Sequence, residues 1–317
     1  MGFMRRIRGD EAGAVPDWAG VLTASEYKRF RALVHDWLRA NSRGFREVDG
    51  GGVDVDLGGE KPTMIGLANL AQKAHLTPPE EWPALVAGHL GTALDSEGID
   101  PAPPFESVRS MLKVRIYPEE FLAAVDSDKK LLVGRVLAPG LLAVLAIDYP
   151  TTVAAVPPDT ADGWGIPYGE LFDIGLRNVR EQDRPGVQRQ QLNTGARISL
   201  LLSDSFFTAT AIFMLEEFLV PRSPHGAIVA LPNRHAVVFA SIVDLSIVEA
   251  TETIISLAEQ MYRDGPGPIS PNIYWWRDGG LTLLPTRHGG EATIFEPPAE
   301  FIDVLNQLHK PGPDQAR

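Results

Sequence analysis

Residues 273–285 have the sequence IYWWRDGGLTLLP, which predicts a β-hairpin. Two apolar runs flank Asp278-Gly279-Gly280, and glycine after aspartate is typical of a tight turn between antiparallel strands. Successive side chains of a strand point to opposite faces, so Trp275 and Trp276 must point in opposite directions. The strand therefore needs a cover on each face. We expect core helices on one face, and either a second domain or a binding partner on the other.

The sequence around this hairpin alternates predicted strands and helices. Strands are expected at 111–118, as a pair within 131–148 that meets at Pro139-Gly140, and at 197–203, 227–233 and 236–241. Helices are expected at 167–181, 205–219, 246–263 and 298–309, and a loop at 153–165. This order predicts an α+β or mixed α/β domain over residues 109–309, in which helices cover a mixed sheet.

A smaller unit of α-β-β-β-α order is predicted over residues 20–95. Thr23 and Glu26 have the spacing of a capping box, and Thr77 and Glu80 repeat it before a second helix. Residues 44–59 read as two strands joined by glycines, and 63–74 as a third strand running into a loop. We expect an irregular segment at 1–19, a proline-rich linker at 96–108 and a disordered tail at 310–317.

The composition favours a soluble, cytoplasmic protein. The chain has 317 residues, of which 44% are hydrophobic and 22% charged, as in ordinary globular proteins. Its net charge of −12 repels nucleic acid and anionic membranes, so neither is expected as a partner, whereas a basic protein would suit it. No cysteine is present, which excludes disulfides, thiolate metal sites and cysteine nucleophiles. No apolar run is long and unbroken enough to span a bilayer.

Two polar clusters at strand ends are the candidate sites. Asp204 and Ser205 lie between a predicted strand and a helix, where α/β enzymes often keep a nucleophile, but the G-x-S-x-G turn is missing, which favours a helix cap. Asn233, Arg234 and His235 lie between two predicted strands. Such a basic cluster binds a carboxylate or phosphate in many proteins, but a polar hairpin turn looks much the same.

No pattern indicates a metal or cofactor. Asp54 and Asp56 fall on one face of a strand but have no third oxygen ligand fixed nearby, which favours a solvated edge strand. The glycines that follow lack the P-loop spacing, because Pro62 stands where Ser or Thr is needed. The seven histidines show no paired ligand spacing. We therefore expect no cofactor, no metal and no sequence-local catalytic motif.

Five segments of the C-terminal part follow one another along the chain: LLAVLAIDYPTTVAAV, GIPYGELFDIGLRNV, SLLLSDSFFTATAIFMLEEF, AIVALPNRHAVVFAS and GPGPISPNIYWWRDGGL. In this order they resemble the YtpQ-like family of uncharacterised bacterial proteins, and the resemblance covers roughly residues 110–285. The pattern of that family has an Asp-Ser pair before a helix and a Pro-[Ser/Asn]-Arg-Asp run between strands. Asp204-Ser205 and Pro232-Asn233-Arg234 match it, whereas His235 replaces the acid. The resemblance implies a fold and a cytosolic location, but no activity.

Two hypotheses follow from the sequence. The first is a non-catalytic protein-binding module: an adaptor, a chaperone-like protein or an inhibitor that neutralises a basic toxin. Its expected binding residues are Tyr274 and Trp276 together with Asn233, Arg234 and His235. The alternative is a hydrolase that assembles Asp204, Ser205, Arg234 and His235 at one sheet edge. The sequence indicates neither the identity of the partner nor the oligomeric state.

Overall fold

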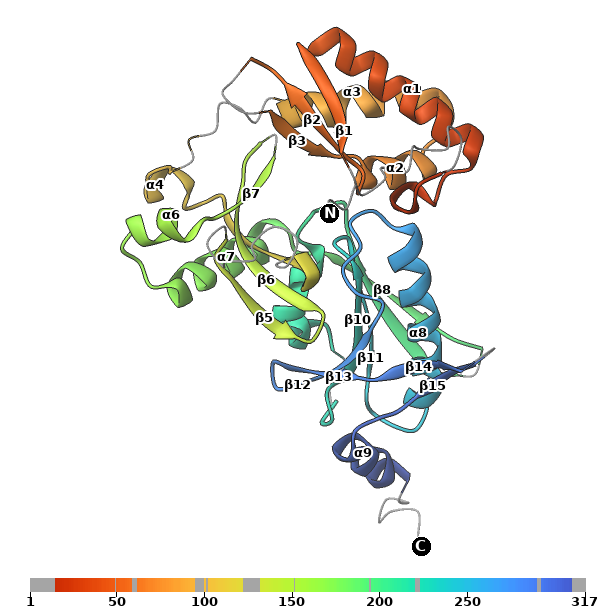
Figure 1. Ribbon diagram of the computed structural model, residues 1–317. Helices are drawn as coiled ribbons and strands as arrows, with labels where there is room; N and C mark the ends of the chain where they lie inside the picture. Colours follow the sequence, from red (N-terminus) through yellow and green to blue (C-terminus); the bar gives the residue numbers. More distant parts are fainter. Residues whose placement is uncertain are drawn as a thin grey trace, which may run out of the picture. The chain divides into compact units, whose positions relative to one another are not determined.

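The computed structural model describes residues 15–48, 50–58, 62–94, 100, 102–121, 132–150, 152–193, 195–219, 223–289 and 292–309. The chain divides into two compact units, Met1–Gly98 and Ile99–Arg317, coloured red to orange and orange to blue in Figure 1. The expected tail at 310–317 and most of the expected irregular start lie outside the described residues.

The N-terminal unit is a three-stranded antiparallel sheet with helices on one face. The strands are β1 (Gly44–Val48), β2 (Gly52–Asp56) and β3 (Thr63–Gly66), in the order β1-β2-β3. The helices are α1 (Ala24–Asn41), α2 (Ala68–His75) and α3 (Trp82–Leu94), with short 3-10 turns at η1 (Asp17–Ala19) and η2 (Pro79–Glu81). Val53 and Val55 of the central strand share a core with buried side chains of the three helices.

One of the two predicted capping boxes is present. Thr23 Oγ1 accepts from the Glu26 amide (3.3 Å), and Glu26 Oε2 accepts from the Thr23 amide (2.8 Å), so α1 begins as predicted. The second prediction is wrong, because the Thr77 hydroxyl donates to the Lys73 carbonyl instead (2.8 Å). Thr77 therefore closes α2, which occupies the place of the expected loop.

The C-terminal unit contains two larger antiparallel sheets. The first has the order β13-β12-β10-β11-β9-β8, and the second has β6 paired with β4 on one side and with β5 and β7 on the other. The strands of the first sheet are β8 (Gly186–Gln191), β9 (Arg197–Leu202), β10 (Ala227–Asn233), β11 (Ala236–Ser241), β12 (Ile273–Arg277) and β13 (Gly280–Leu284). Those of the second are β4 (Leu112–Pro118), β5 (Gly134–Ala138), β6 (Leu141–Asp148) and β7 (Val153–Ala155).

The described sheets are antiparallel throughout, so the prediction of a mixed sheet is wrong, although the α+β class is confirmed. The connection through α8 (Ile247–Asp264) gives the physical reason. Strands β11 and β12, which α8 joins, run in the same direction, but β10 lies between them and pairs with both. A crossover that skips one strand leaves every neighbouring pair antiparallel.

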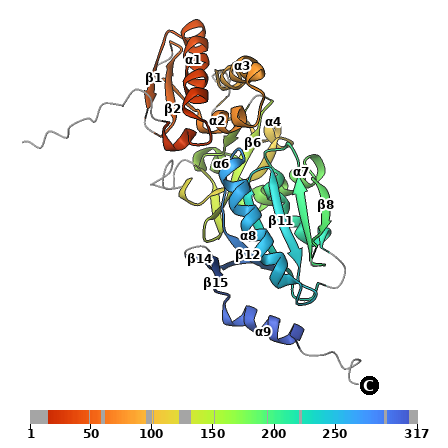
Figure 2. The same ribbon diagram turned by 90° about the vertical axis from the view of Figure 1, so that its right-hand side faces the viewer.

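Both tryptophans of β12 are buried, and both covers lie inside the C-terminal unit. Trp276 is 7% exposed and packs between the two sheets, together with side chains of α7 (Tyr168–Gln182) and η4 (Thr208–Phe218). Trp275 is 3% exposed and faces α8 and α9 (Ala299–His309); Figure 2 shows α8 lying along this sheet. The ring of Phe301 from α9 stands edge-on to Trp275. The sandwich of layers thus covers both faces of the strand.

Several short elements escape the sequence patterns. The expected loop at 153–165 contains β7 and α6 (Pro158–Gly163), and the expected linker contains α4 (Phe105–Val108). The helix expected at 205–219 is η4, a 3-10 helix with a kink at Met214. Strand β8 and the ribbon of β14 (Thr286–Gly289) with β15 (Ala292–Phe295) were not expected. Such short or exposed elements lack the apolar periodicity that reveals longer ones.

Candidate functional site

The turn between β10 and β11 is held rigidly by its own side chains and by the segment after α8. Asn233 Oδ1 accepts from the His235 amide (3.0 Å), and Asn233 Nδ2 donates to the Met261 carbonyl (3.0 Å). The Arg234 amide donates to the carbonyl of Gly267 (3.0 Å). Gly267 has φ +69°, and a Cβ there would lie 2.7 Å from Arg234 Cδ, so glycine is needed at this close approach.

Arg234 is the buried cation of this turn. Its side chain is only 5% exposed, and its Cζ lies 4.4 Å from the centre of the Phe206 ring. Its Nε donates to His235 Nε2 (3.0 Å), so His235 carries its proton on Nδ1, which lies 3.3 Å from the Ser203 carbonyl oxygen. Burial, and then the charge of Arg115, lower the pKa of Arg234 to about 10. The guanidinium nevertheless stays charged at neutral pH.

A second guanidinium, that of Arg115 on β4, approaches the same ring. Its Cζ lies 5.6 Å from the centre of Phe206 and 4.6 Å from that of Tyr117. Arg115 Nε is buried without a hydrogen-bond partner among the described residues. We call Arg115, Tyr117, Phe206, Arg234 and His235 the two-arginine site.

Neither guanidinium of the two-arginine site has a counter-ion in the described part of the chain. The ion pairs formed within 4.0 Å among the described residues involve other cations. Two like charges beside one aromatic ring repel each other, and cation–π contacts offset only part of their lost hydration. The described residues therefore supply no anionic group to balance the charges of Arg115 and Arg234.

Ser205, a member of the alternative hydrolase hypothesis, belongs to a different network. Its hydroxyl donates to Asp183 Oδ1 (2.7 Å) and accepts from the Phe207 amide (3.1 Å). Asp183 in turn pairs with Lys113 of β4 (2.6 Å), which also pairs with Asp148 (2.7 Å). Ser205 therefore fixes the turn before η4 and one carboxylate of a buried ion cluster.

Lys113 is the centre of that ion cluster and is only 4% exposed. Burial lowers the pKa of Lys113, but its hydrogen bonds to Asp148 and Asp183 raise it by more, so the pKa lies above its usual value. Asp183, the partner of Ser205, is thus already held in an ion pair with Lys113. His235, another member of the hydrolase hypothesis, accepts a hydrogen bond from Arg234 at its Nε2. Asp204, the fourth predicted member, is exposed.

Tyr274 and Trp276 are interior residues, which corrects the expectation that they present aromatic surface to a partner. Tyr274 is fully buried; its hydroxyl donates to the Pro139 carbonyl (2.9 Å) and lies 3.0 Å from the Ser270 hydroxyl. Burial raises the pKa of Tyr274. The carbonyl of Trp276 passes so close to Gly226 that a Cβ there would lie 2.0 Å from it. Both rings stabilise the packing of the two sheets.

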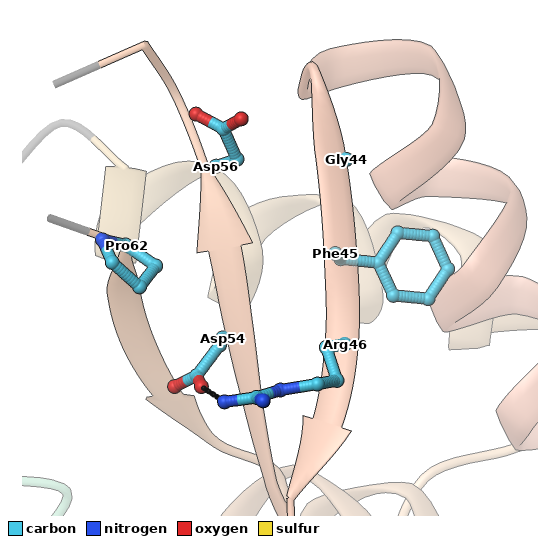
Figure 3. Close-up of a pocket in the computed structure, with 6 residues that line it drawn as sticks. All are labelled: Gly44, Phe45, Arg46, Asp54, Asp56 and Pro62. Atoms are coloured by element: carbon cyan, nitrogen blue, oxygen red, sulfur yellow. Dashed lines mark hydrogen bonds and ion pairs between the residues drawn. The ribbon is translucent and has the colours of Figure 1, made fainter.

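The N-terminal unit has a shallow groove of about 300 Å³ on the sheet face opposite its core. Asp54 of this groove pairs with Arg46 (2.7 Å), whereas Asp56 Oδ1 accepts from the Gly58 amide (2.8 Å). Figure 3 shows Asp56 apart from the Arg46–Asp54 pair and Phe45 on the other side of its strand. Both aspartates lie on β2, the central strand, so the prediction that they lie on an edge strand is wrong. They are solvated because they lie on the open face of the sheet.

The described residues contain no cluster of three or more histidine, aspartate or glutamate side chains that could hold a metal ion. No helix in the described ranges is long and apolar enough to cross a membrane.

The sequence patterns indicated Arg234 and His235 but missed Arg115, Tyr117 and Phe206. The polar alternation Lys113, Arg115, Tyr117 in a strand is the signal that was available for Arg115. Only the fold reveals that this strand approaches the β10–β11 turn.

Comparison of the chain with family models, with curated proteins and with solved structures finds no match.

Proposed function

We propose that the chain is a non-catalytic binding protein that recognises an anionic group through the two-arginine site. The observation that carries this proposal is the meeting of two guanidinium groups at Phe206 without a carboxylate partner among the described residues. Guanidinium groups bind carboxylates and phosphates through paired N–H donors, and a partly buried site strengthens such contacts.

The energetic argument rests on Arg234. Lowering the pKa of Arg234 from the ordinary value of an arginine to about 10 corresponds to about 3 kcal/mol of destabilisation of the charged form. An anion bound beside it would offset this cost and would therefore bind to the folded protein alone. A charge kept buried at such a cost is typical of functional sites.

Binding agrees better than hydrolysis with the contacts of the polar residues. Ser205 is bonded to Asp183, and the ring nitrogen of His235 that could act as a base accepts from Arg234. A hydrolase needs a base within hydrogen-bonding reach of its nucleophile.

The basic partner expected from the composition and the anionic group expected at the site are attracted over different distances. The net charge of −12 attracts a basic partner from a distance and repels polyanions such as nucleic acid. The two-arginine site acts only at contact, so it suits a small anionic group. The basic protein partner stays a prediction from the net charge.

Calorimetric titration with sulfate and with acetate at constant ionic strength tests the proposal. We expect saturable binding of at least one anion to the wild type, weakened tenfold or more in Arg115→Met and in Arg234→Met. Arg180→Met is the matched control, because Arg180 of α7 already pairs with Glu217 (3.1 Å) and is 55% exposed. Absence of binding to the wild type, or equal affinity in all four proteins, would show the proposal to be wrong.

A further inference from the structure

We infer that the anionic group at the two-arginine site is a phosphate monoester in its doubly charged form. This inference rests on the proposed anion binding and adds the chemical class of the ligand. Three observations carry it: the charge of the site, the number of donors it presents, and its burial.

The charge of the site favours a dianion. Arg115 and Arg234 each contribute one positive charge, while His235 is neutral because its Nε2 accepts a hydrogen bond. Their Cζ atoms lie 5.6 and 4.4 Å from the centre of one ring, so they are at most about 10 Å apart, the sum of the two distances. The nearby cation Lys113 is already matched by Asp148 and Asp183. A singly charged carboxylate would leave one guanidinium unmatched.

The donors also exceed what a carboxylate accepts. One guanidinium fork fills both oxygens of a carboxylate, whereas the three terminal oxygens of a phosphate monoester can receive two forks. Among the described residues, no hydrogen bond is formed by Arg115 Nε, and Arg234 uses only its Nε, towards His235. The remaining donors therefore suit a group with three oxygens.

The burial of the two guanidinium groups favours a terminal phosphate over a phosphate inside a chain. Arg234 is 5% exposed and Arg115 Nε is inaccessible to solvent. A phosphodiester carries a single charge and continues on both sides, so it can neither match two cations nor approach end-on. A phosphate monoester has one free end, so it needs access to the guanidinium groups from one side only.

The titration of the ester itself provides the test. The second pKa of a phosphate monoester is about 6, so about a tenth remains doubly charged at pH 5. We would measure the affinities of O-phosphoserine, glycerol phosphate, sulfate and acetate for the full chain between pH 5 and pH 8. Sulfate keeps its two charges throughout. The ratio of ester to sulfate affinity therefore removes the effect of any titration of His235, Tyr117, Arg115 or Arg234.

We expect the esters to bind more tightly than acetate at pH 8, and the ester-to-sulfate ratio to fall about tenfold between pH 8 and pH 5. Arg115→Met should lose the preference for dianions over acetate. The two esters distinguish a protein-borne phosphate from one on a small metabolite, according to which binds more tightly. A constant ratio, or acetate binding as tightly as the esters, overturns the inference while the proposed anion binding stands. Failure of all four probes overturns both.

Discussion

Arg234 is a buried charge that we propose binds an anion. Its guanidinium is buried, lies near a second guanidinium and has a lowered pKa of about 10. A purely structural arginine with these properties would normally have a carboxylate partner. The turn sequence Asn233-Arg234-His235 indicates Arg234 as a candidate binding residue. No residue next to it in the sequence indicates that it is buried, because the contacts that bury it come from Phe206 and Gly267.

Replacing Arg234 with methionine should not destabilise the protein. Methionine keeps the apolar contact with Phe206 and removes the buried charge, so we expect the free energy of unfolding to stay equal or to rise by up to about 3 kcal/mol. Urea denaturation at pH 7 measures this change. The folded pKa lies below the unfolded value, so the cost is fully present below pH 10 and declines as the pH rises further. The difference between variant and wild type should therefore narrow above pH 10. A loss of several kcal/mol would indicate a structural role instead.

Strand β4 contributes one cation to the Lys113 ion cluster and one to the proposed anion-binding site of the C-terminal unit. Leu112, Val114 and Ile116 point into the core between the sheets, while Lys113 and Arg115 lie on the alternate face. Lys113 is matched by two carboxylates, and Arg115 by none among the described residues. Lys113 and Arg115 thus lie on the same face of β4, but only Lys113 has carboxylate partners among the described residues.

Lys113→Met should behave in the opposite way to Arg234→Met. It leaves Asp148 and Asp183 as neighbouring carboxylates without their cation, which typically costs about 3–5 kcal/mol. The raised pKa of Lys113 means that its contribution is complete at pH 7 and is lost only as the pH rises through the folded value. Urea denaturation at pH 7 should show this loss, and Arg180→Met, at an exposed pair, should lose less than about 1 kcal/mol. Equal losses in the two variants would contradict the assignment of Lys113 as a buried ion centre.

The elements that the sequence predicted are those with strong local signals. Asp278 and Gly279 have positive φ angles (51° and 79°), so the Asp-Gly-Gly turn formed where its composition indicated. Thr23 formed its capping box, whereas Thr77 had the same spacing but closed the preceding helix. Pairing of β4 with β6 and the approach of β4 to Phe206 depend on contacts far apart in the chain. No periodicity encodes such contacts, which is why Arg115, Tyr117 and Phe206 of the two-arginine site were missed.

At the scale of the whole molecule, each unit has its own hydrophobic core. The buried core residues of the N-terminal unit fall between Ala19 and Leu90, and those of the C-terminal unit between Val108 and Val304. Cores of this kind are able to unfold in separate transitions.

Trp82→Ala should destabilise the N-terminal unit alone. The Trp82 ring is 1% exposed and its Nε1 donates to the Ala74 carbonyl (2.9 Å), so its loss should cost about 3–5 kcal/mol. Scanning calorimetry should show one transition moved to lower temperature. Sulfate bound at the two-arginine site should raise the temperature of the other transition, and this effect should be the same in the variant and the wild type, since the two-arginine site lies in the C-terminal unit. If the substitution abolished the sulfate effect, the units would not be energetically independent.

The neighbouring indoles of β12 turn a single strand into a pair of optical probes. Trp276 emits from the layer between the two sheets, and Trp275, with the Arg277 guanidinium 4.4 Å from its ring centre, emits from beneath the helices. Substituting phenylalanine at one position or the other removes the emission of that indole alone, while the other five tryptophans of the chain remain. The order in which the two layers unfold during denaturation can thus be followed from the difference between the fluorescence of the variant and that of the wild type, without any attached dye.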